Sequence, residues 1–351
     1  MTRVLCSSGA SCSSRPYLFR LSRRRFLGAG LLAASGLLLP GCRGAVPRAL
    51  ALPSTPTAGL RPEADFAVEG KIAYVKGGDV WRWSGGRSQQ ITRGNAYEGP
   101  AWSPDGTLLA ASYMGENHSD VVVLTETGVR VRQLTHNFSS VSVKAQAWGR
   151  KPAWSPDGRR VAYISDQGPL DAFGNKTLDM SLFLVNADGT DLRKLLVQRP
   201  FTGGLDWPTW SADGIRIAYT VFDAAPSQIQ VYNLTTGEWR NLTNHPEGAY
   251  DPAWSPDGRW IAYTVRENGR HDVHVMRSDG SVSTRITDTG ANVAPAWSPD
   301  GQLLAYLSNV GGYFDVFVVR LRLADDTAAS EPRQLTRGEN VEAQSGLSWS
   351  R

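Results

Sequence analysis

Cysteine is scarce in this chain. Only Cys6, Cys12 and Cys42 occur among its 351 residues. Because no cysteine follows Cys42, the rest of the chain cannot form a disulfide of its own. The motif G-x-S-x-G, which presents the nucleophilic serine of α/β-hydrolases, is also absent. The sequence therefore supports neither a disulfide-stabilised fold nor a peptidase of that class.

An excess of positive charge is missing from most of the chain, although the formal net charge is +4. Six arginines lie within residues 1–41, where no acidic residue occurs, and without them 31 basic residues face 33 acidic ones. A protein that binds nucleic acid needs a basic surface. We therefore expect no nucleic-acid partner.

Long apolar runs are absent except for "FLGAGLLAASGLLLP" at residues 26–40. This run is rich in Gly and Ala, and it is shorter than the roughly 20 residues of a membrane-spanning helix. Arg23 and Arg24 stand just before it, in a segment that resembles the twin-arginine export consensus. We expect residues 1–41 to be an export signal, and an uncleaved anchor helix is the alternative.

The sequence "LPGC" at residues 39–42 resembles a lipoprotein box, in which the cysteine becomes the first mature residue and carries lipid. A lipid on Cys42 would hold the protein at a membrane by burying its methylene groups. Residues 42–66 are rich in Pro and Ala and lack periodicity, which indicates a tether. We expect an exported protein of the periplasm or outer cell surface that touches the membrane through its lipid alone. A free surface cysteine in an unprocessed protein is the alternative.

From residue 67 to residue 351 the sequence is periodic. The heptapeptide "PAWSPDG" starts at residues 100, 152, 252 and 295, and a Trp recurs once per unit, 43 to 56 residues apart. These are Trp102, Trp154, Trp210, Trp254, Trp297 and Trp349. Units of roughly this length are typical of propeller blades. One aromatic residue at the same position of every unit indicates packing between blades rather than a ligand site.

Each unit has the pattern of four strands. Its "SPDG" segment has the residue preferences of a type I turn, and an alternating strand such as "RVAYIS" (160–165) follows. Six units of four antiparallel strands, without helical spacing, predict an all-β, six-bladed β-propeller. The first unit lacks its first strand, and the last residues, "GLSWSR", can supply one. We therefore expect the C-terminal strand to join the N-terminal blade and close the ring, which removes open sheet edges.

The stretch "PAWSPDGRRVAYIS", followed in the same unit by "SLFLVNADGTDLRKL", resembles the WD40-like (PD40) repeat of the TolB family. The resemblance covers residues 67–351. It implies a six-bladed propeller and a role similar to that of TolB, which docks a peptidoglycan-associated lipoprotein and other partners. TolB itself carries an α/β domain before its propeller, whereas only the predicted tether precedes the repeats here. The same repeat also occurs in peptidases and lyases, so the resemblance fixes the fold more firmly than the function.

We expect ligand recognition on the face opposite the uniform "SPDG" corners. The long irregular joins, at residues 113–119, 136–150, 166–180 and 198–207, belong to that face, and long loops on a rigid scaffold often carry recognition. The residues just before each inner strand should lie there at the mouth of the central channel. They are Tyr97, Glu98, Arg150, Lys151, Asp206, Trp207, Tyr250, Asp251, Asn292 and Gln344. Such a mixture suits a peptide or a sugar, and a solvated rim without a ligand is the alternative.

The leading hypothesis is a monomeric propeller that binds an envelope protein or peptide, with no catalytic residues, metal or cofactor. The alternative is a carbohydrate-binding or carbohydrate-active propeller, a lyase or hydrolase with its site in the channel. Related pectin-type lyases use channel histidines and a divalent metal, and the expected mouth contains no histidine. His271 and His274 should point to opposite faces of one strand, which does not make a metal pair. A further alternative is a Ca²⁺ loop built from Asp166, Asp171, Asn175 and Asp179.

Overall fold

The computed structural model describes residues 66–168, 180–196, 204–222, 226–323 and 328–351. The predicted export signal, with Arg23 and Arg24, lies outside the described residues, as do Cys42 and the predicted tether up to residue 65. Most of the candidate Ca²⁺ loop also lies outside them.

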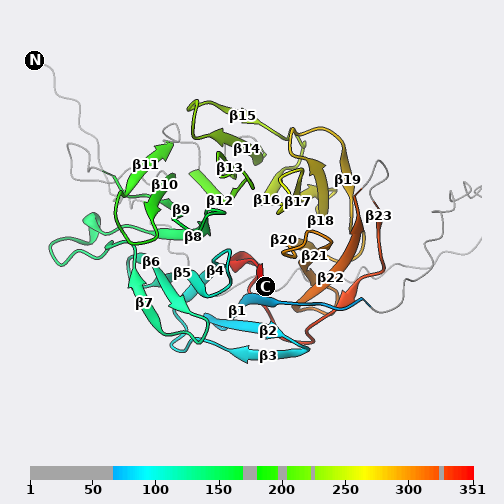
Figure 1. Ribbon diagram of the computed structural model, residues 1–351, viewed down its shortest axis with the longest axis horizontal. Coiled ribbons are helices and arrows are strands. Elements are labelled where there is room, and N and C mark those ends of the chain that lie inside the picture. The colour runs from blue at the N-terminus through cyan, green and yellow to red at the C-terminus, as the bar shows by residue number, and fades with distance from the viewer. Residues whose placement is uncertain (1–65, 169–179, 197–203, 223–225, 324–327) are drawn as a thin grey trace, which may run out of the picture. The chain divides into compact units, whose positions relative to one another are not determined.

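The described residues form six β-sheets that surround a central channel as blades (Figure 1). From blade one to blade six, the inner strands beside the channel are β25 (Ser348–Ser350), β4 (Tyr97–Trp102), β8 (Gly149–Trp154), β12 (Gly204–Trp210), β16 (Ala249–Trp254) and β20 (Asn292–Trp297). The second strands are β1 (Lys71–Lys76), β5 (Leu108–Met114), β9 (Arg160–Ser165), β13 (Arg216–Phe222), β17 (Trp260–Glu267) and β21 (Leu303–Asn309).

The third strands are β2 (Asp79–Ser84), β6 (Ser119–Thr125), β10 (Ser181–Asn186), β14 (Gln228–Asn233), β18 (Arg270–Arg277) and β22 (Phe314–Arg322). The outer strands are β3 (Arg87–Gln90), β7 (Arg130–Gln133), β11 (Arg193–Leu196), β15 (Trp239–Asn241), β19 (Ser283–Arg285), and in blade six β23 (Ala328–Ala329) and β24 (Arg333–Gln334). Two short 3-10 turns, η1 (Val143–Ala145) and η2 (Ala343–Ser345), complete the described elements.

The prediction of an all-β, six-bladed propeller with antiparallel blades is confirmed. Blade six differs from the expected four strands because β22 is nine residues long and pairs with two short strands, β23 and β24. The longer third strand has room for two segments to pair along its outer edge, so two short strands take the place of one outer strand in this blade.

The C-terminal strand closes the ring, as predicted. β25 pairs antiparallel with β1 through Lys71–Ser350, Ile72–Trp349 and Ala73–Ser348. The indole Nε1 of Trp349 also donates a hydrogen bond to the Glu69 carbonyl (2.9 Å). The first blade is thus assembled from both ends of the propeller body, which we define as residues 66–351.

The hydrophobic core lies between the blades. Six clusters of buried side chains each join two neighbouring blades, and one of them unites blade one with blade six. Tyrosines of the second strands, such as Tyr74 and Tyr163, are fully buried there. Burial of apolar area at about 25 cal/mol per Å² is the main stabilising contribution to such a core. Because the described strands and all six clusters lie within residues 66–351, the propeller body contains its own core.

A buried aspartate at the start of the third strand fastens the end of the outer strand in several blades. Asp120 accepts hydrogen bonds from Thr135 Oγ1 (2.9 Å) and the backbone amide of Asn137 (2.7 Å). Asp315 accepts equivalent bonds from Thr336 Oγ1 and the Gly338 amide, both at 2.8 Å. These contacts explain why the sequence repeats "DV" and "LT", and they fix the chain that leads into the next blade.

The "SPDG" corners follow the inner strands and are held by local hydrogen bonds. In blade five, Ser255 Oγ donates to Asp257 Oδ1 (2.6 Å) and accepts from the Trp260 amide (2.9 Å). Blade four has Ala212 where the other corners have proline, yet its turn keeps the hydrogen bond from the Gly214 amide to the Ser211 carbonyl (2.9 Å). The five corners therefore share one geometry and place their proline or alanine around one end of the channel.

Candidate functional site: the central channel

Every inner segment carries a residue in the left-handed backbone conformation at the same point. These residues are Gly99 (φ 58°), Lys151 (φ 52°), Trp207 (φ 52°), Asp251 (φ 53°), Ala294 (φ 54°) and Gly346 (φ 74°). In blades two to six the pairing with the second strand shifts register at this point. Such a bulge changes the direction of a side chain. Four of the six residues are not glycine, and for each of them this backbone conformation is unfavourable by about 1–3 kcal/mol. We call these six residues the bulge ring.

Lys151, Trp207 and Gly346 meet across the channel at the level of the bulge ring. Lys151 Nζ lies 3.8 Å from the centroid of the Trp207 ring and donates a hydrogen bond to the Gln344 carbonyl. A Cβ atom added at Gly346 would overlap the Trp207 ring atoms Cη2 and Cζ3. Since blades four and one face each other in a six-bladed ring, the Trp207 indole reaches across the channel. The missing side chain of Gly346 provides the space for it.

The contact between Trp207 and Gly346 gives a testable prediction. The Gly346→Ala substitution should lower the free energy of unfolding by about 2–4 kcal/mol, because it adds a steric overlap and a strained left-handed alanine. In a Trp207→Ala background the overlap is gone, so the same substitution should cost about 1–2 kcal/mol. Urea denaturation of the four proteins in this double-mutant cycle measures the difference. Equal costs in both backgrounds would show that Trp207 does not occupy this position.

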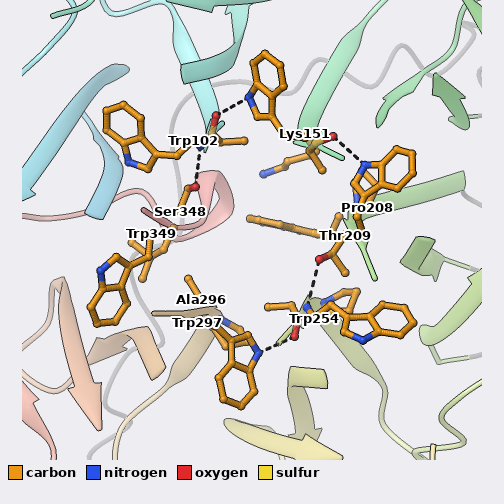
Figure 2. Close-up of a pocket in the computed structure, with 18 of the residues that line it drawn as sticks. Trp102, Lys151, Pro208, Thr209, Trp254, Ala296, Trp297, Ser348 and Trp349 are labelled. Carbon is orange, nitrogen blue, oxygen red and sulfur yellow. Dashed lines mark hydrogen bonds between the residues drawn. The ribbon is translucent and has the colours of Figure 1, made fainter. Parts of the chain in front are cut away.

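On the corner side of the bulge ring lies a cavity of about 400 Å³ (Figure 2). Lys151, Trp207 and Asp251 line its floor, small residues such as Thr209 and Ser348 line its wall, and the corner prolines with Ala212 line its rim. Glu98, Arg150, Asp206 and Tyr250 are not among its lining residues. The cavity is therefore a pocket that opens toward the corners and ends at the bulge ring. We call it the channel pocket.

The repeated tryptophans form the outer boundary of this pocket. Each is less than a tenth exposed, and the indoles of Trp154, Trp210 and Trp297 donate hydrogen bonds to carbonyls of the preceding blade (2.9–3.1 Å). Figure 2 shows these contacts together with those from the Trp102 amide to Ser348 Oγ (2.9 Å) and from the Trp254 amide to Thr209 Oγ1 (3.2 Å). The pocket wall is thus tied from blade to blade.

The charged groups at the floor are held in a desolvated environment. Burial raises the pKa of Asp251 to about 6, although the nearby charge of Lys151 and a hydrogen bond from Thr264 Oγ1 (3.1 Å) oppose the rise. Burial lowers the pKa of Lys151, and the carboxylate of Asp206 acts against this shift. Perturbed ionisable groups in a cavity are typical of functional sites.

Other residues expected at the channel mouth lie beyond the bulge ring, on the face opposite the corners. Arg150 Nη2 pairs with Glu98 Oε2 (2.8 Å) between blades two and three. Asp206 Oδ1 accepts a hydrogen bond from the backbone amide of Trp207 (2.9 Å). The centroid of the Tyr250 ring lies 6.3 Å from the ring centroids of Phe222 and His271.

Besides Lys151, two of the expected mouth residues are buried, Tyr97 and Asn292. Tyr97 is 8% exposed and packs against Tyr113 between blades one and two, with ring centroids 5.3 Å apart. Asn292 is 1% exposed, and its amide donates to Asp272 (3.2 Å) and to the Thr289 carbonyl (2.7 Å). Their contacts belong to the core and to the blade joins, so substitution of either residue would disturb packing as well as any ligand.

Sequence reasoning missed Thr209 and Ser348 in the pocket wall, although both immediately precede a repeat Trp. The available signal was their polarity at a position that is alanine in the other blades. His274 is half-buried, and the centroid of its ring lies 6.1 Å from that of His245. Among the described residues, no group of three or more His, Cys, Asp or Glu side chains could hold a metal ion.

The fold and site together define a six-bladed β-propeller with a channel pocket that is closed at one end. A family model described as the TolB beta propeller domain matches residues 170–344. The crystal structure of TolB from Acinetobacter baumannii superimposes with a TM-score of 0.59 at 18% identity, covering 80% of this chain and 66% of that one. The chain belongs to the TolB-like PD40 β-propeller family, as the resemblance implied.

Two curated relatives match shorter stretches. The Tol-Pal system protein TolB of Methylococcus capsulatus is 34% identical over 116 residues, which are 33% of this chain and 24% of that protein. Dipeptidyl-peptidase 5 of Porphyromonas gingivalis is 26% identical over 181 residues, which are 46% of this chain and 24% of the peptidase. The chain thus spans about a quarter of the length of each relative. In the part of the chain that the structure describes, no helix has the length and apolar character needed to cross a membrane.

Proposed function

We propose that this protein is a binding scaffold of the bacterial cell envelope, in which the propeller holds a protein or peptide segment in the channel pocket. Residues 1–41 export the chain, Cys42 carries a lipid, and residues 42–66 tether the propeller body to the membrane. The similarity to a Tol-Pal system protein supports a protein partner in the envelope. The export motif and the lipoprotein box in the sequence support the location.

The observation that carries this proposal is the shape and lining of the channel pocket. Its volume, about 400 Å³, lies within the range of pockets that bind small ligands. Its wall is built from alanines, Thr209 and Ser348, which leave room for a narrow chain, and charged groups are confined to the floor. A pocket with a wall of small side chains and a charged end fits one extended segment of a partner.

The pocket wall argues less well for a sugar ligand. Sugar rings commonly stack on exposed aromatic faces, and each of the six repeated tryptophans is less than a tenth exposed. Trp207 is the pocket indole that is partly exposed, and Lys151 already covers one of its faces. If no protein binds, the alternative is that the pocket binds a carbohydrate.

A single bulky residue at the pocket rim tests the proposal. Ala212 is exposed on the rim in the blade-four corner, so Ala212→Trp should obstruct entry without disturbing the core. The matched control is Val310→Trp, which adds the same side chain to an exposed position in the join between β21 and β22, on the opposite face. The wild-type propeller body and both variants are used as baits in pull-downs from envelope extract. We expect the wild type and the Val310→Trp control to capture the same protein.

The Ala212→Trp variant should lose at least nine-tenths of that captured protein. If the control loses the partner and Ala212→Trp keeps it, the binding site lies on the opposite face. If none of the three proteins captures a partner, a glycan panel with the same variants decides between the protein and carbohydrate proposals.

A further inference from the structure

The carboxylate of Asp251 is the unpaired charge at the floor of the channel pocket. Its Oδ2 atom accepts a hydrogen bond from Thr264 Oγ1 (3.1 Å), and its backbone amide donates to Thr220 Oγ1 (3.2 Å). No ion pair of Asp251 occurs among the described residues. A partly buried carboxylate without an ionic partner loses solvation, so its presence in a cavity calls for a ligand to complete it.

Lys151, the nearest cation, is already engaged by the protein. Its ammonium group lies over the Trp207 ring at 3.8 Å and donates to the Gln344 carbonyl. It is 5% exposed, so little of its surface is open to a ligand. By contrast, Asp251 is partly exposed and lines the pocket. Of the two opposite charges at the floor, the carboxylate is the one that a ligand can reach.

The charges around the floor leave a net negative value. Glu98 and Arg150 neutralise each other at 2.8 Å, which leaves the carboxylates of Asp206 and Asp251 against the single ammonium of Lys151. These groups lie on both sides of the bulge ring, and together they carry a net charge of −1. That charge favours a cation at the floor, because electrostatic attraction is stronger where water is excluded.

The shape of the pocket restricts which cation can arrive. The wall presents small side chains, and the floor is narrowed by the Trp207 indole. A primary ammonium is compact and offers three hydrogen-bond donors, whereas a guanidinium is a wide planar group. The ammonium can therefore reach the carboxylate at the end of a slender chain.

From this geometry we propose that Asp251 binds a primary ammonium group at the leading end of the ligand. The proposal rests on the proposed function, in which a partner segment enters the channel pocket from the corner side. Two sources have this chemistry: the α-ammonium at the free amino terminus of a partner, and the side-chain ammonium of a lysine. Asp251 would pair with the ammonium, Thr264 would hold the carboxylate in place, and the small side chains of the wall would surround the following residues.

Three short peptides test the proposal with the propeller body by isothermal titration calorimetry. The first is tetra-alanine amide with a free amino terminus, the second is its N-acetylated form, and the third is N-acetyl-Lys-Ala-Ala amide. We expect at least one of the two amine-bearing peptides to bind at least tenfold more tightly than the acetylated tetra-alanine. The better of the two identifies the source of the ammonium.

The Asp251→Asn variant keeps the size of the side chain and removes its charge. It should lose the preference for the amine-bearing peptides, so that the tenfold ratio falls to about one. Glu116→Gln, which neutralises an exposed carboxylate in the join between β5 and β6, should keep the ratio. Equal binding of acetylated and free peptides to the wild type, an unchanged ratio in Asp251→Asn, or no binding of either amine probe at millimolar concentration overturns the inference. A partner whose capture Ala212→Trp still blocks would then leave the proposed function standing without it.

Discussion

Deletion of residues 345–351 should strongly destabilise the propeller body, so that it melts at a much lower temperature or without a cooperative transition. The deletion removes β25, so blade one loses its inner strand and β1 gains an open edge beside the channel. It also removes the buried Trp349, and loss of a buried Trp alone costs about 3–5 kcal/mol. Because whole domains are stable by only about 5–15 kcal/mol, we expect a fall in Tm of more than 15 °C or no cooperative transition at all.

Circular dichroism melts of three variants beside the wild type measure this effect. The control is deletion of Arg351 alone, which leaves all three residue pairs between β25 and β1 in place. Trp349→Ala should give an intermediate loss, since it keeps the strand but removes the indole and its hydrogen bond to Glu69. A truncated protein that melts like the wild type would contradict closure of the ring by β25.

Neutralising Asp251 should stabilise the protein at alkaline pH. Burial raises the pKa of Asp251 from 3.8 to about 6, so the folded protein holds this proton more tightly than the unfolded chain does. The resulting stability is fully present below pH 3.8 and is lost as the pH rises through 6. A shift of this size corresponds to about 3 kcal/mol at most, at 1.36 kcal/mol for each pKa unit. At pH 8, Asp251→Asn should therefore raise the free energy of unfolding by about 1–3 kcal/mol.

Urea denaturation at pH 8 and at pH 4 checks this sign. At pH 4 the Asp251 side chain is already largely protonated in the folded state, so the variant and the wild type should differ by less than at pH 8. Glu116→Gln serves as the exposed control and should change little at either pH. A residue whose neutralisation stabilises the fold and weakens binding would be kept for its function, since stability and function often conflict at such sites. A destabilised Asp251→Asn variant at pH 8 would contradict the charge balance described for the pocket floor.

The sequence was sufficient to predict the fold because the same short patterns recur in every blade. The corner "SPDG" specifies a turn from local residue preferences, and the alternating second strand specifies its buried face. The missing first strand of blade one and the extra strand at the C-terminus together predicted the closure by β25. These features depend on residues that are close in sequence, apart from the closure itself, which follows from counting strands.

The channel pocket could be predicted only in part. Lys151, Trp207 and Asp251 were expected near the channel, but the direction of their side chains depends on the left-handed bulge that precedes the proline of their inner strands. The contact between Trp207 and Gly346 joins residues that are far apart in sequence and opposite in the ring. No local pattern shows that this contact ends the pocket, so the sequence alone directed attention to the long joins on the other face. The same local pattern does not distinguish Tyr97 and Asn292, which are buried, from residues that line the pocket.

The most direct test of the account asks which end of the channel a bound partner covers. The propeller body contains no cysteine, so Ala212→Cys at the pocket rim and Val310→Cys on the opposite face each introduce a unique thiol. The rate of alkylation of each thiol is measured with and without the partner captured from envelope extract. We predict at least tenfold slower alkylation in the Ala212→Cys protein when the partner is bound, and an unchanged rate in the Val310→Cys protein. Protection of the Val310→Cys thiol alone would place the partner on the face with the long joins and contradict the channel pocket as the binding site.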